Sequence, residues 1–384
     1  MKIMNKILSK SNSYNYYKSN FEKFKKENKQ LKHNNQEKER TIKENKKQLN
    51  EKNQEIKNKD KEITRLNNDF KKLKKEKEQT IKKLKNQLNE KNQELKNKDK
   101  EITRLYYYAP KAIGRKWLYE KRMGRELDLN SPKDFNEKIN WLIVNKYGEE
   151  EGKLTDKILV KDYIKSKNVK DLFIPKTYKI YKDANEINIQ ELPEKFVLKC
   201  NHGSGLVFVC LDKETFDLNK AKTELNKSLK ENYALKGLEY HYEYIEPYIM
   251  AEEYLNDEKH IMPIDYKFYS FNGKVENILV CSNRENKLKL DDFDLEWNLQ
   301  NHTLSEWKSE NKIEKPKNLE KMIKIAEELG KDFLFVRVDL YEINDKIYFG
   351  ELTFTPGNAT INYYNQETLD FLGEKLILPL DSQD

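Results

Sequence analysis

Apolar residues recur at every seventh position in the first part of the chain, and this spacing predicts one long helix. The apolar positions form two such series, the second displaced by four positions from the first: Ile42, Leu49, Ile56, Ile63 and Phe70, then Ile81, Leu88, Leu95 and Ile102. Residues 50–66 recur almost unchanged at 89–105, an offset of 39 residues that equals four heptads plus one eleven-residue step. The repeat therefore contains a stutter between Phe70 and Ile81.

The apolar seam of this helix is thin, because many positions that would face a partner helix are Lys or Asn. A few further leucines reinforce the seam: Leu66, Leu73, Leu84 and Leu105. A helix of this kind is stable mainly when it pairs with another copy of itself. We therefore expect a homo-oligomeric coiled coil over residues 21–105, preceded by a tail at 1–20. The alternative is a solvated, charged spacer.

Charge divides the chain at the same place. Residues 1–105 hold 32 Lys and Arg against 16 Asp and Glu, a net charge of +16, whereas residues 106–384 hold 42 against 50, a net charge of −8. A basic helix suits an anionic surface such as a membrane face. We do not expect nucleic-acid recognition, because no aromatic residues are interleaved through the helical part and no nucleic-acid-binding motif is present.

The remainder of the chain has the pattern of a globular body. All 12 glycines and all 9 prolines lie after residue 108. A first helix is predicted with Ser131 as its N-cap and Pro132 at its first position. Amphipathic spacing predicts a second helix over 155–167 and a third over 318–332, which ends near Gly330.

Short apolar runs separated by turns predict the strands: 176–181, 195–200, 206–212, 248–255, 265–282 and 333–357. The last two runs each contain a turn, at 272–274 and at 344–346, that predicts an antiparallel hairpin. Strands and helices alternate without the regular βαβ rhythm of a doubly wound sheet. The pattern therefore predicts a mixed α+β fold.

Cysteine usage and hydropathy favour a cytoplasmic protein. The three cysteines, Cys200, Cys210 and Cys281, are odd in number and lie in apolar, strand-like surroundings, as in proteins of a reducing compartment. No apolar run reaches the roughly 18 residues of a transmembrane helix, and the N-terminal apolar stretch is too short for a secretory signal. The basic helix would allow peripheral contact with the inner face of the membrane.

The stretch "KCNHGSGLVFVC" at 199–210 has three chemical interpretations. A zinc site would need a second pair of ligands beside Cys200 and His202, and none follows. A nucleophilic cysteine would need an orienting third group and an oxyanion site. A glycine–serine–glycine turn between two strands can instead expose backbone N–H groups to phosphate, with Lys199 on the incoming strand. The phosphate interpretation is therefore favoured, and buried packing is expected for the cysteines.

Charged residues alternate with apolar ones on two later strands. Arg337 and Asp339 point to one face of their strand, and Glu351 and Thr353 do the same on the strand that follows the turn. Two carboxylates and an arginine on one face suit Mg²⁺ that bridges phosphate oxygens. Lys267, a lysine within another strand, requires an anionic partner there. The alternative is an ordinary solvated sheet face with an ion pair.

The order of these parts resembles the ATP-grasp superfamily, and more specifically the TupA-like ATP-grasp family, which is associated with teichuronopeptide and other cell-surface polysaccharide biosynthesis. The similar stretches are "NSPKDFNEKINWL", "PEKFVLKCNHGSG", "DYKFYSFNGK", "LEWN" and "DFLFVRVDLYEINDKIYFGELTFTPGN". The resemblance covers about residues 110–380. It implies an ATP-grasp fold, with two α+β subdomains that hold a nucleotide, behind the N-terminal helix. The body then comprises an N-terminal part at 106–190 and a nucleotide-binding region at 191–384.

The resemblance also implies roles for individual residues. The residues implied to hold ATP are Lys199, His202, Gly203, Ser204 and Gly205 at its phosphates, and Glu252, Glu253 and Tyr254 at its adenine and ribose. The residues implied to stabilise the transferring phosphoryl group are Lys267 and Arg337. The residues implied to bind Mg²⁺ are Asp339, Glu351 and Thr353. The superfamily normally has Asn at the position of Thr353, so its hydroxyl, its backbone oxygen, water or Asn358 must replace that ligand.

The resemblance implies an ATP-dependent ligase that activates a carboxylate as an acyl phosphate and passes it to an amine or another nucleophile. Two alternatives remain: a glycosyl or phosphoryl transferase of glycan assembly on the same fold, and a nucleotide-binding coiled-coil scaffold. The substrate is a small molecule or glycan that the sequence does not specify. Residues that bind it are expected in the N-terminal part of the body and in the 283–315 insert, including Arg284, Trp297 and Trp307.

Overall fold

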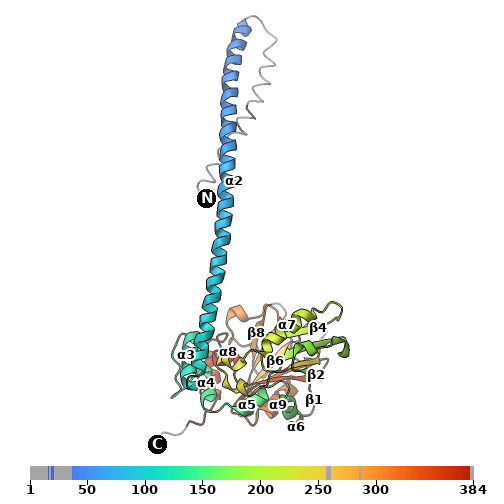
Figure 1. Cartoon of the computed structure of the whole chain (residues 1–384). Coiled ribbons are helices and arrows are strands. Elements are labelled where there is room, and N and C mark those ends of the chain that lie inside the picture. The colour runs from blue at the N-terminus through green and yellow to red at the C-terminus, as the bar shows by residue number, and fades with distance from the viewer. Residues whose placement is uncertain (1–15, 17–18, 21–36, 257–260, 285–286, 381–384) are drawn as a thin grey trace. The chain divides into compact units, whose positions relative to one another are not determined.

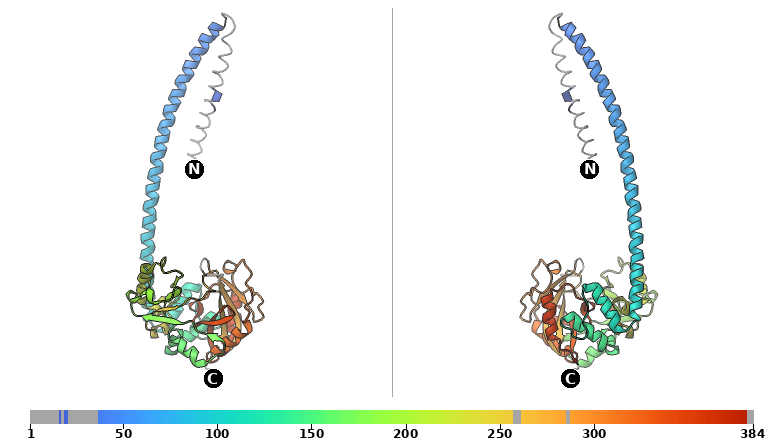
Figure 2. Two further views of the ribbon diagram at one scale, coloured as in Figure 1. Left: turned by 90° about the vertical axis from the view of Figure 1, so that its right-hand side faces the viewer. Right: turned by 90° about the vertical axis from the view of Figure 1, so that its left-hand side faces the viewer.

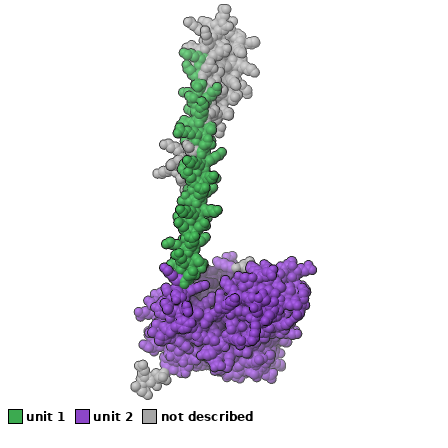
Figure 3. Space-filling model, viewed as in Figure 1, with its two compact units in different colours: residues 1–97 green, residues 98–384 purple. Residues whose placement is uncertain are grey.

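The computed structural model describes residues 37–256, 261–284 and 287–380, together with 16 and 19–20. The chain forms two units, residues 1–97 and 98–384 (Figure 3). We call the described part of the first unit the arm and the second unit the body. The tail predicted at 1–20 lies almost wholly outside the described residues, as does the start of the predicted coiled coil.

Helix α2, Glu37–Tyr107, confirms the predicted long helix. It contains neither Gly nor Pro, the two residues that most weaken a helix interior. Its pairing with a second copy stays a prediction.

The larger sheet of the body has the strand order β1-β10-β9-β6-β7-β8. Its strands are β1 Leu172–Phe173, β6 Asp265–Phe271, β7 Lys274–Ser282, β8 Lys289–Phe293, β9 Phe335–Ile343 and β10 Lys346–Thr353. All neighbours are antiparallel except β1, which runs parallel to β10. Both predicted hairpins are confirmed, and their turns use left-handed backbone at Asn272, Gly273, Asn344 and Asp345.

The smaller sheet has the order β2-β5-β3-β4 and is antiparallel throughout. Its strands are β2 Thr177–Tyr181, β3 Phe196–Cys200, β4 Val207–Cys210 and β5 Ile249–Glu253. In β3, Phe196 and Leu198 face a separate hydrophobic core with Ala221 and Leu225 of α7, Leu218–Leu229. Lys199 therefore points to the opposite face of this sheet. The two sheets form separate lobes of the body (Figure 2).

The remaining helices cover the sheets and the connections (Figure 1). The α-helices are α3 Lys111–Met123, α4 Phe135–Asn145, α5 Glu149–Thr155, α6 Val160–Lys167, α8 Tyr233–Gly237, α9 Leu319–Gly330 and α10 Gln366–Lys375. The 3-10 turns are η2 Ala184–Glu186, η3 Ile189–Glu191, η4 Tyr240–Tyr244, η5 Ser305–Trp307 and η6 Pro356–Ala359. Together with the larger sheet, α4, α9 and α10 contribute to the main hydrophobic core, so the fold is α+β as predicted.

Two predicted helix starts were wrong. Helix α4 begins at Phe135 with Asp134 as its N-cap, whose side chain accepts a hydrogen bond from Glu137 N, rather than at Pro132 with Ser131 as its N-cap. The helix predicted over 155–167 begins only at Val160. The preceding turn is held instead by Asp156, whose carboxylate accepts hydrogen bonds from Ile158 N (2.7 Å) and from the Asn201 side chain (2.9 Å). In both cases an Asp side chain captures backbone N–H groups and fixes where the helix begins.

Candidate functional site

A row of buried and half-buried charged residues crosses the larger sheet. Asp339 on β9 lies in register with Lys267 on β6 and with Glu351 on β10. Arg337 lies in register with Thr353 on β10. Residues in register on neighbouring antiparallel strands point to the same face, so the structure brings together the five residues expected at the phosphoryl group and the metal.

Arg337 holds Asp339 through a two-pronged ion pair. Its Nε and Nη2 donate to the two carboxylate oxygens of Asp339, each at 2.7 Å. Lys267 donates to Asp339 and, at 2.6 Å, to Asp265. Paired, planar contacts of this kind are among the stronger hydrogen bonds in proteins. The two cations are consequently fixed in position inside the body.

Glu351 is held from two sides. Lys157 Nζ lies 3.3 Å from one of its oxygens and Arg337 Nη2 lies 3.3 Å from the other. The Thr353 hydroxyl donates to Glu351 (3.1 Å) and accepts from Arg337 (3.0 Å). Burial would raise the pKa of Glu351, but Lys157, Lys267 and Arg337 together lower it well below its ordinary value. Glu351 is therefore ionised and available as a ligand for a cation.

Both central cations also remain charged. Burial alone would lower the pKa of Lys267, and Asp265 and Asp339 raise it above the ordinary value. Burial opposes the charge on Arg337 as well, and Asp339 raises its pKa beyond the usual range. These groups thus present fixed positive charge toward the face of the sheet.

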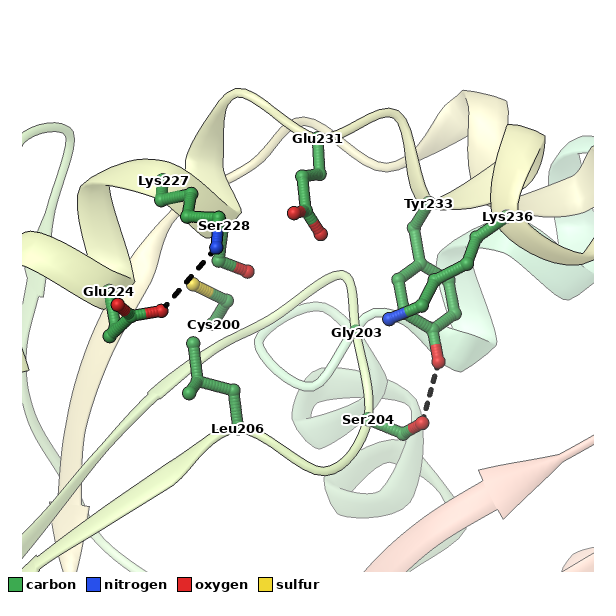
Figure 4. Close-up of a pocket in the computed structure, with 10 residues that line it drawn as sticks. All are labelled: Cys200, Gly203, Ser204, Leu206, Glu224, Lys227, Ser228, Glu231, Tyr233 and Lys236. Atoms are coloured by element: carbon green, nitrogen blue, oxygen red, sulfur yellow. Dashed lines mark hydrogen bonds and ion pairs between the residues drawn. The ribbon is translucent and has the colours of Figure 1, made fainter. Parts of the chain in front are cut away.

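The glycine-rich loop between β3 and β4 is tied to this cluster. Lys157 Nζ donates to the Gly203 carbonyl at 2.9 Å, so one lysine links the loop and Glu351. Ser204 shares a 2.6 Å hydrogen bond with the Tyr233 hydroxyl, and Gly205 has a φ of +86°, which only glycine adopts easily. A cavity of about 180 Å³ lies between this loop and helices α7 and α8 (Figure 4).

Lys199 belongs to a second buried ion cluster. It lies 2.5 Å from one oxygen of Glu252, whose other oxygen lies 2.7 Å from Lys161. Burial would raise the pKa of Glu252, but Lys199 and Lys161 lower it. Lys161 also donates to the Pro175 carbonyl and to the Thr177 hydroxyl. The predicted phosphate lysine and the predicted hinge glutamate are therefore direct partners.

The other predicted hinge residues lie at the end of β5. Glu253 exchanges backbone and side-chain hydrogen bonds with Lys176: its N–H donates to the Lys176 carbonyl, and its carboxylate accepts from Lys176 N at 3.0 Å. The Tyr254 hydroxyl donates to the Ile261 carbonyl at 2.8 Å. The roles of both residues toward adenine or ribose stay predictions.

His202 lies in the loop after β3 of the smaller sheet, Cys200 and Cys210 lie on β3 and β4 of that sheet, and Cys281 lies on β7 of the larger sheet. The His202 ring is buried, its Nε2 lies 3.1 Å from the Ser228 carbonyl, and burial lowers its pKa. It therefore helps to shape the loop, and its contact with phosphate stays a prediction. Cys200, Cys210 and Cys281 are free and buried, and burial raises the pKa of each thiol. This agrees with the expectation of packed cysteines.

The carboxylates on the larger sheet fit Mg²⁺ in the manner of nucleotide-bound sites, with a few protein oxygens completed by phosphate and water. Asp339 and Glu351 lie on neighbouring strands, and Asp265 Oδ1 on the same sheet is buried without a hydrogen-bond partner. Across the described residues, no three His, Cys, Asp or Glu side chains form a complete metal cage. Asn358 Oδ1 accepts from Arg115 at 2.8 Å, whereas the Thr353 hydroxyl lies 3.1 Å from Glu351 Oε1.

Sequence reasoning missed several residues of the site. Lys157 and Lys161 were assigned only to an amphipathic helix, and Asp265 was assigned no role. Asn201, which is fully buried, anchors the start of the glycine-rich loop to Asp156 and Tyr248. The sequence signal for this part of the site was the spacing of Lys157 and Lys161, four residues apart before a strand. Such a spacing is too common to indicate a functional site.

The residues of the 283–315 insert occupy different places. Arg284 Nη1 lies 3.9 Å from Asp265, at the edge of the charged row. Trp297 stacks on Phe293 with ring centroids 4.2 Å apart and is part of the packing. Trp307 lies edge-on to Tyr363 at 6.2 Å and is half-buried. A role in substrate binding stays a prediction for all three.

One comparison with known proteins assigns the chain to a family. The family model described as TupA-like ATPgrasp matches residues 137–377. No protein of curated function matches the chain significantly. In the part of the chain that the structure describes, no helix is both long and apolar enough to cross a lipid bilayer.

Several solved structures are similar to the chain at low sequence identity. The chain is similar to the D-alanine–D-alanine ligase from Bacillus anthracis complexed with ATP, at 16% identity and a TM-score of 0.33, over 58% of this chain and 62% of that one. The chain is also similar to the L-amino acid ligase from Bacillus licheniformis, at 12% identity and a TM-score of 0.35, over 53% of this chain and 43% of that one. A third similar structure is the ATP-grasp ligase PsnB complexed with minimal precursor, at 11% identity and a TM-score of 0.32, over 63% of this chain and 62% of that one. The chain covers less than two thirds of each, and similarity at this level concerns the fold alone.

Proposed function

The chain belongs to the TupA-like ATP-grasp family, and we propose that it is an ATP- and Mg²⁺-dependent ligase of cell-surface polysaccharide or teichuronopeptide-type biosynthesis. In this reaction a carboxylate is activated as an acyl phosphate and then joined to an amine or another nucleophile. The family match supports the nucleotide chemistry.

The observation that carries the proposal is the cluster of Arg337, Lys267, Asp339 and Glu351 on one sheet face, in which Arg337 and Asp339 are buried and Lys267 and Glu351 are half-buried. Arg337 and Lys267 are 8% and about one-tenth exposed, respectively, and each is held by carboxylates at hydrogen-bond distance. Positive charge that is already oriented stabilises the charge that develops when a phosphoryl group is transferred, because little reorganisation is needed. An ordinary solvated sheet face would not hold its cations in this way.

The remaining residues would position the nucleotide. Lys199 and the N–H groups of the loop Gly203–Gly205 would contact its phosphates, and Glu253 and Tyr254 would lie beside its base and ribose. Glu252 would keep Lys199 in place. Asp339, Glu351 and the Thr353 hydroxyl would hold Mg²⁺, which neutralises phosphate charge when bound.

We further propose that the protein acts at the inner face of the membrane as a homo-oligomer joined through α2. The net charge of +16 on residues 1–105 supports contact with an anionic surface. The exposed leucines of α2 support pairing with a second copy, since Leu88 and Leu95 are 60% and 64% exposed.

The first experiment measures carboxylate activation directly. The full chain is incubated with ATP, Mg²⁺, hydroxylamine and one acid from a panel of uronic acids and amino acids, and both hydroxamate and ADP are quantified. Hydroxamate that depends on one acid and equals the ADP released is the expected result. Glu351→Ala and Lys199→Ala should abolish it, whereas Lys165→Ala, an exposed lysine of α6, should leave it unchanged.

The same preparations separate the alternatives. A glycosyltransferase would bind a nucleotide sugar more tightly than ATP in calorimetric titration. A scaffold would bind ATP with no hydroxamate and no ADP for any acid. Absence of nucleotide binding, with the two site variants indistinguishable from the wild type, would overturn the proposed function.

A further inference from the structure

An aspartate–histidine pair lies in the body outside the phosphoryl cluster. His302 Nδ1 is 2.5 Å from Asp292 Oδ2, in the 283–315 insert where substrate-binding residues were expected, although neither residue was singled out there. Asp292 is fully buried, whereas the His302 side chain is 25% exposed. The pair thus has a buried acidic end and an accessible imidazole end.

The other contacts of the pair fix which nitrogen is free. Asp292 Oδ1 accepts from the Asn277 side chain (2.8 Å) and from the Tyr364 hydroxyl (2.9 Å). Asp292 Oδ2 therefore faces the imidazole. When Asp292 is ionised this oxygen can only accept, and the hydrogen is then on Nδ1. Nε2 then keeps its lone pair, and no described residue occupies it with a hydrogen bond.

The backbone of His302 is also anchored. Its carbonyl accepts hydrogen bonds from Asn365 N at 3.0 Å and from the Thr368 hydroxyl at 3.3 Å. A side chain whose backbone and Nδ1 are both held cannot readily turn away. This geometry is what a proton acceptor requires.

The pair shares a sheet face with the phosphoryl cluster. Asp339 is in register with Lys267, Lys267 with Leu279, and Leu279 with Asp292. Residues in register point to the same face, and neighbouring strands lie about 4.8 Å apart. Strand β8 is two strands from β6, so Asp292 stands about 10 Å from Lys267 along one row.

A layer of tyrosines connects the two positions. Tyr269, in register with both Arg337 and Asn277, shares a 3.2 Å hydrogen bond with the Tyr363 hydroxyl. The rings of Tyr363 and Tyr364 are 4.8 Å apart, and Tyr364 donates to Asp292. Beside Leu279, which lies between Lys267 and Asp292 in the row, this face therefore also carries ordered polar groups.

The opposite side of the cluster is taken by the nucleotide-binding parts. On β10, Glu351 faces Lys157, and Lys157 contacts the Gly203 carbonyl of the glycine-rich loop. A nucleotide held by this loop would approach from the β10 side. That arrangement would leave the side of β7 and β8, where His302 lies, for the second substrate.

We propose that His302, oriented by Asp292, is the catalytic base that accepts a proton from the acceptor, and that the acceptor is an amine. This inference rests on the proposed ligase function and names the site of its second substrate. Asp292 is a positioning residue. Its negative charge favours a cationic ammonium group beside the imidazole.

The step balances without a further reactant. The ammonium group of the acceptor loses one proton to His302 Nε2, and its nitrogen lone pair forms a bond to the acyl carbon. The bond between that carbon and the phosphate oxygen breaks, and its electron pair leaves with inorganic phosphate. The second N–H proton of the new amide nitrogen is lost to solvent as the tetrahedral adduct collapses.

The test compares two nucleophiles on the same acyl phosphate. Hydroxylamine is largely uncharged at neutral pH and needs no base, whereas amino acids and D-glucosamine, used as amine probes, are protonated. In His302→Gln we expect amide formation to fall by about 100-fold and hydroxamate formation to change by less than about threefold. Ser305→Ala, an exposed position in the same segment, is the matched control and should alter neither rate.

The outcomes separate this inference from the proposed function. Loss of both products in His302→Gln, or loss of neither, overturns the inference and leaves the ligase function standing. A wild-type chain that forms no hydroxamate with any acid overturns the ligase function. In that event, amine binding is judged by the ¹⁵N resonances of His302, and the absence of a saturable shift with the amine probes overturns the inference as well.

The same ¹⁵N-histidine spectra test the positioning role of Asp292. We expect the neutral His302 ring to carry its proton on Nδ1 in the wild type and to lose this preference in Asp292→Asn, with amide formation reduced. Circular dichroism confirms that the variant is folded. A wild-type ring protonated on Nε2 overturns the assignment.

Discussion

The arm and the body place their apolar and charged side chains in opposite ways. Along α2, Leu84, Leu88 and Leu95 are 58%, 60% and 64% exposed. In the body, Arg337 and Asp339 are 8% and 1% exposed. The arm thus leaves in water the side chains that usually form a core, and the body buries the side chains that usually remain in water.

The difference shows which interactions would stabilise each part of the chain. A helix with an exposed apolar seam gains little from its own fold, and the proposed pairing with a second copy would bury this seam. Buried charges cost desolvation energy and are stable only when each has its partners. The body therefore holds its charged residues in a single arrangement, which is what phosphoryl transfer requires.

The largest effect is expected from breaking the buried cluster. Arg337→Ala leaves Asp339 and Glu351 inside the body without their guanidinium partner, and should lower the free energy of unfolding by about 3–5 kcal/mol. Urea titration followed by circular dichroism measures it. The double variant Arg337→Met with Asp339→Leu removes both charges and should recover much of the loss. A single variant within about 1 kcal/mol of the wild type would contradict the role assigned to the cluster.

A smaller effect is expected on the association of the arm. Leu88→Ala removes a side chain that pairing would bury, and should weaken association by about 1.5–3 kcal/mol without altering the unfolding of the body. Sedimentation equilibrium over a concentration series measures it. Asn86, on the opposite face of the helix, provides the control Asn86→Ala. A wild-type chain that is monomeric at all concentrations would show that the arm is a spacer.

The third prediction concerns pH and the Lys199–Glu252–Lys161 cluster. Because the pKa of Glu252 is lower in the folded chain, its stabilisation is present above the unfolded value of about 4.3 and is lost as the pH falls through the folded value. In Glu252→Gln, the free energy of unfolding should fall by about 1 kcal/mol at pH 7 and decline less steeply in acid. Acid unfolding curves that superimpose on the wild type would refute the stabilising role of this carboxylate.

Much of the fold could be predicted because it depends on local pattern. Alternation along the strands placed Arg337 with Asp339 and Glu351 with Thr353, and the turn residues at 272–274 and 344–346 placed both hairpins. The sequence pattern did not predict the two-residue strand β1, because so short a strand has no alternation of its own and forms through pairing with β10.

The missed parts of the site depend on contacts between distant segments. Lys161 reaches Glu252 across 91 positions, and Lys157 reaches the glycine-rich loop across 46. Periodicity describes which face of an element is buried and carries no information on which distant residue will meet it. His302 was missed for the same reason. Asp292 comes to lie on the face of the charged row only through the pairing of β8 with β7, which the sequence pattern does not predict.

The smallest effect is expected where the body carries an ion pair in water. Lys165 and Asp162 of α6 lie 2.9 Å apart, but their side chains are 64% and 80% exposed. Water and salt screen such a pair, so Lys165→Ala should change the free energy of unfolding by no more than about 0.5 kcal/mol. Lys161, one helical turn earlier, has the same charge, and urea titration of Lys161→Ala should show a far larger loss because Glu252 would be left buried and less well paired. If Lys165→Ala and Lys161→Ala lowered the free energy of unfolding equally, burial would not decide the strength of these ion pairs. The explanation of the body's order by buried, partnered charges would then be wrong.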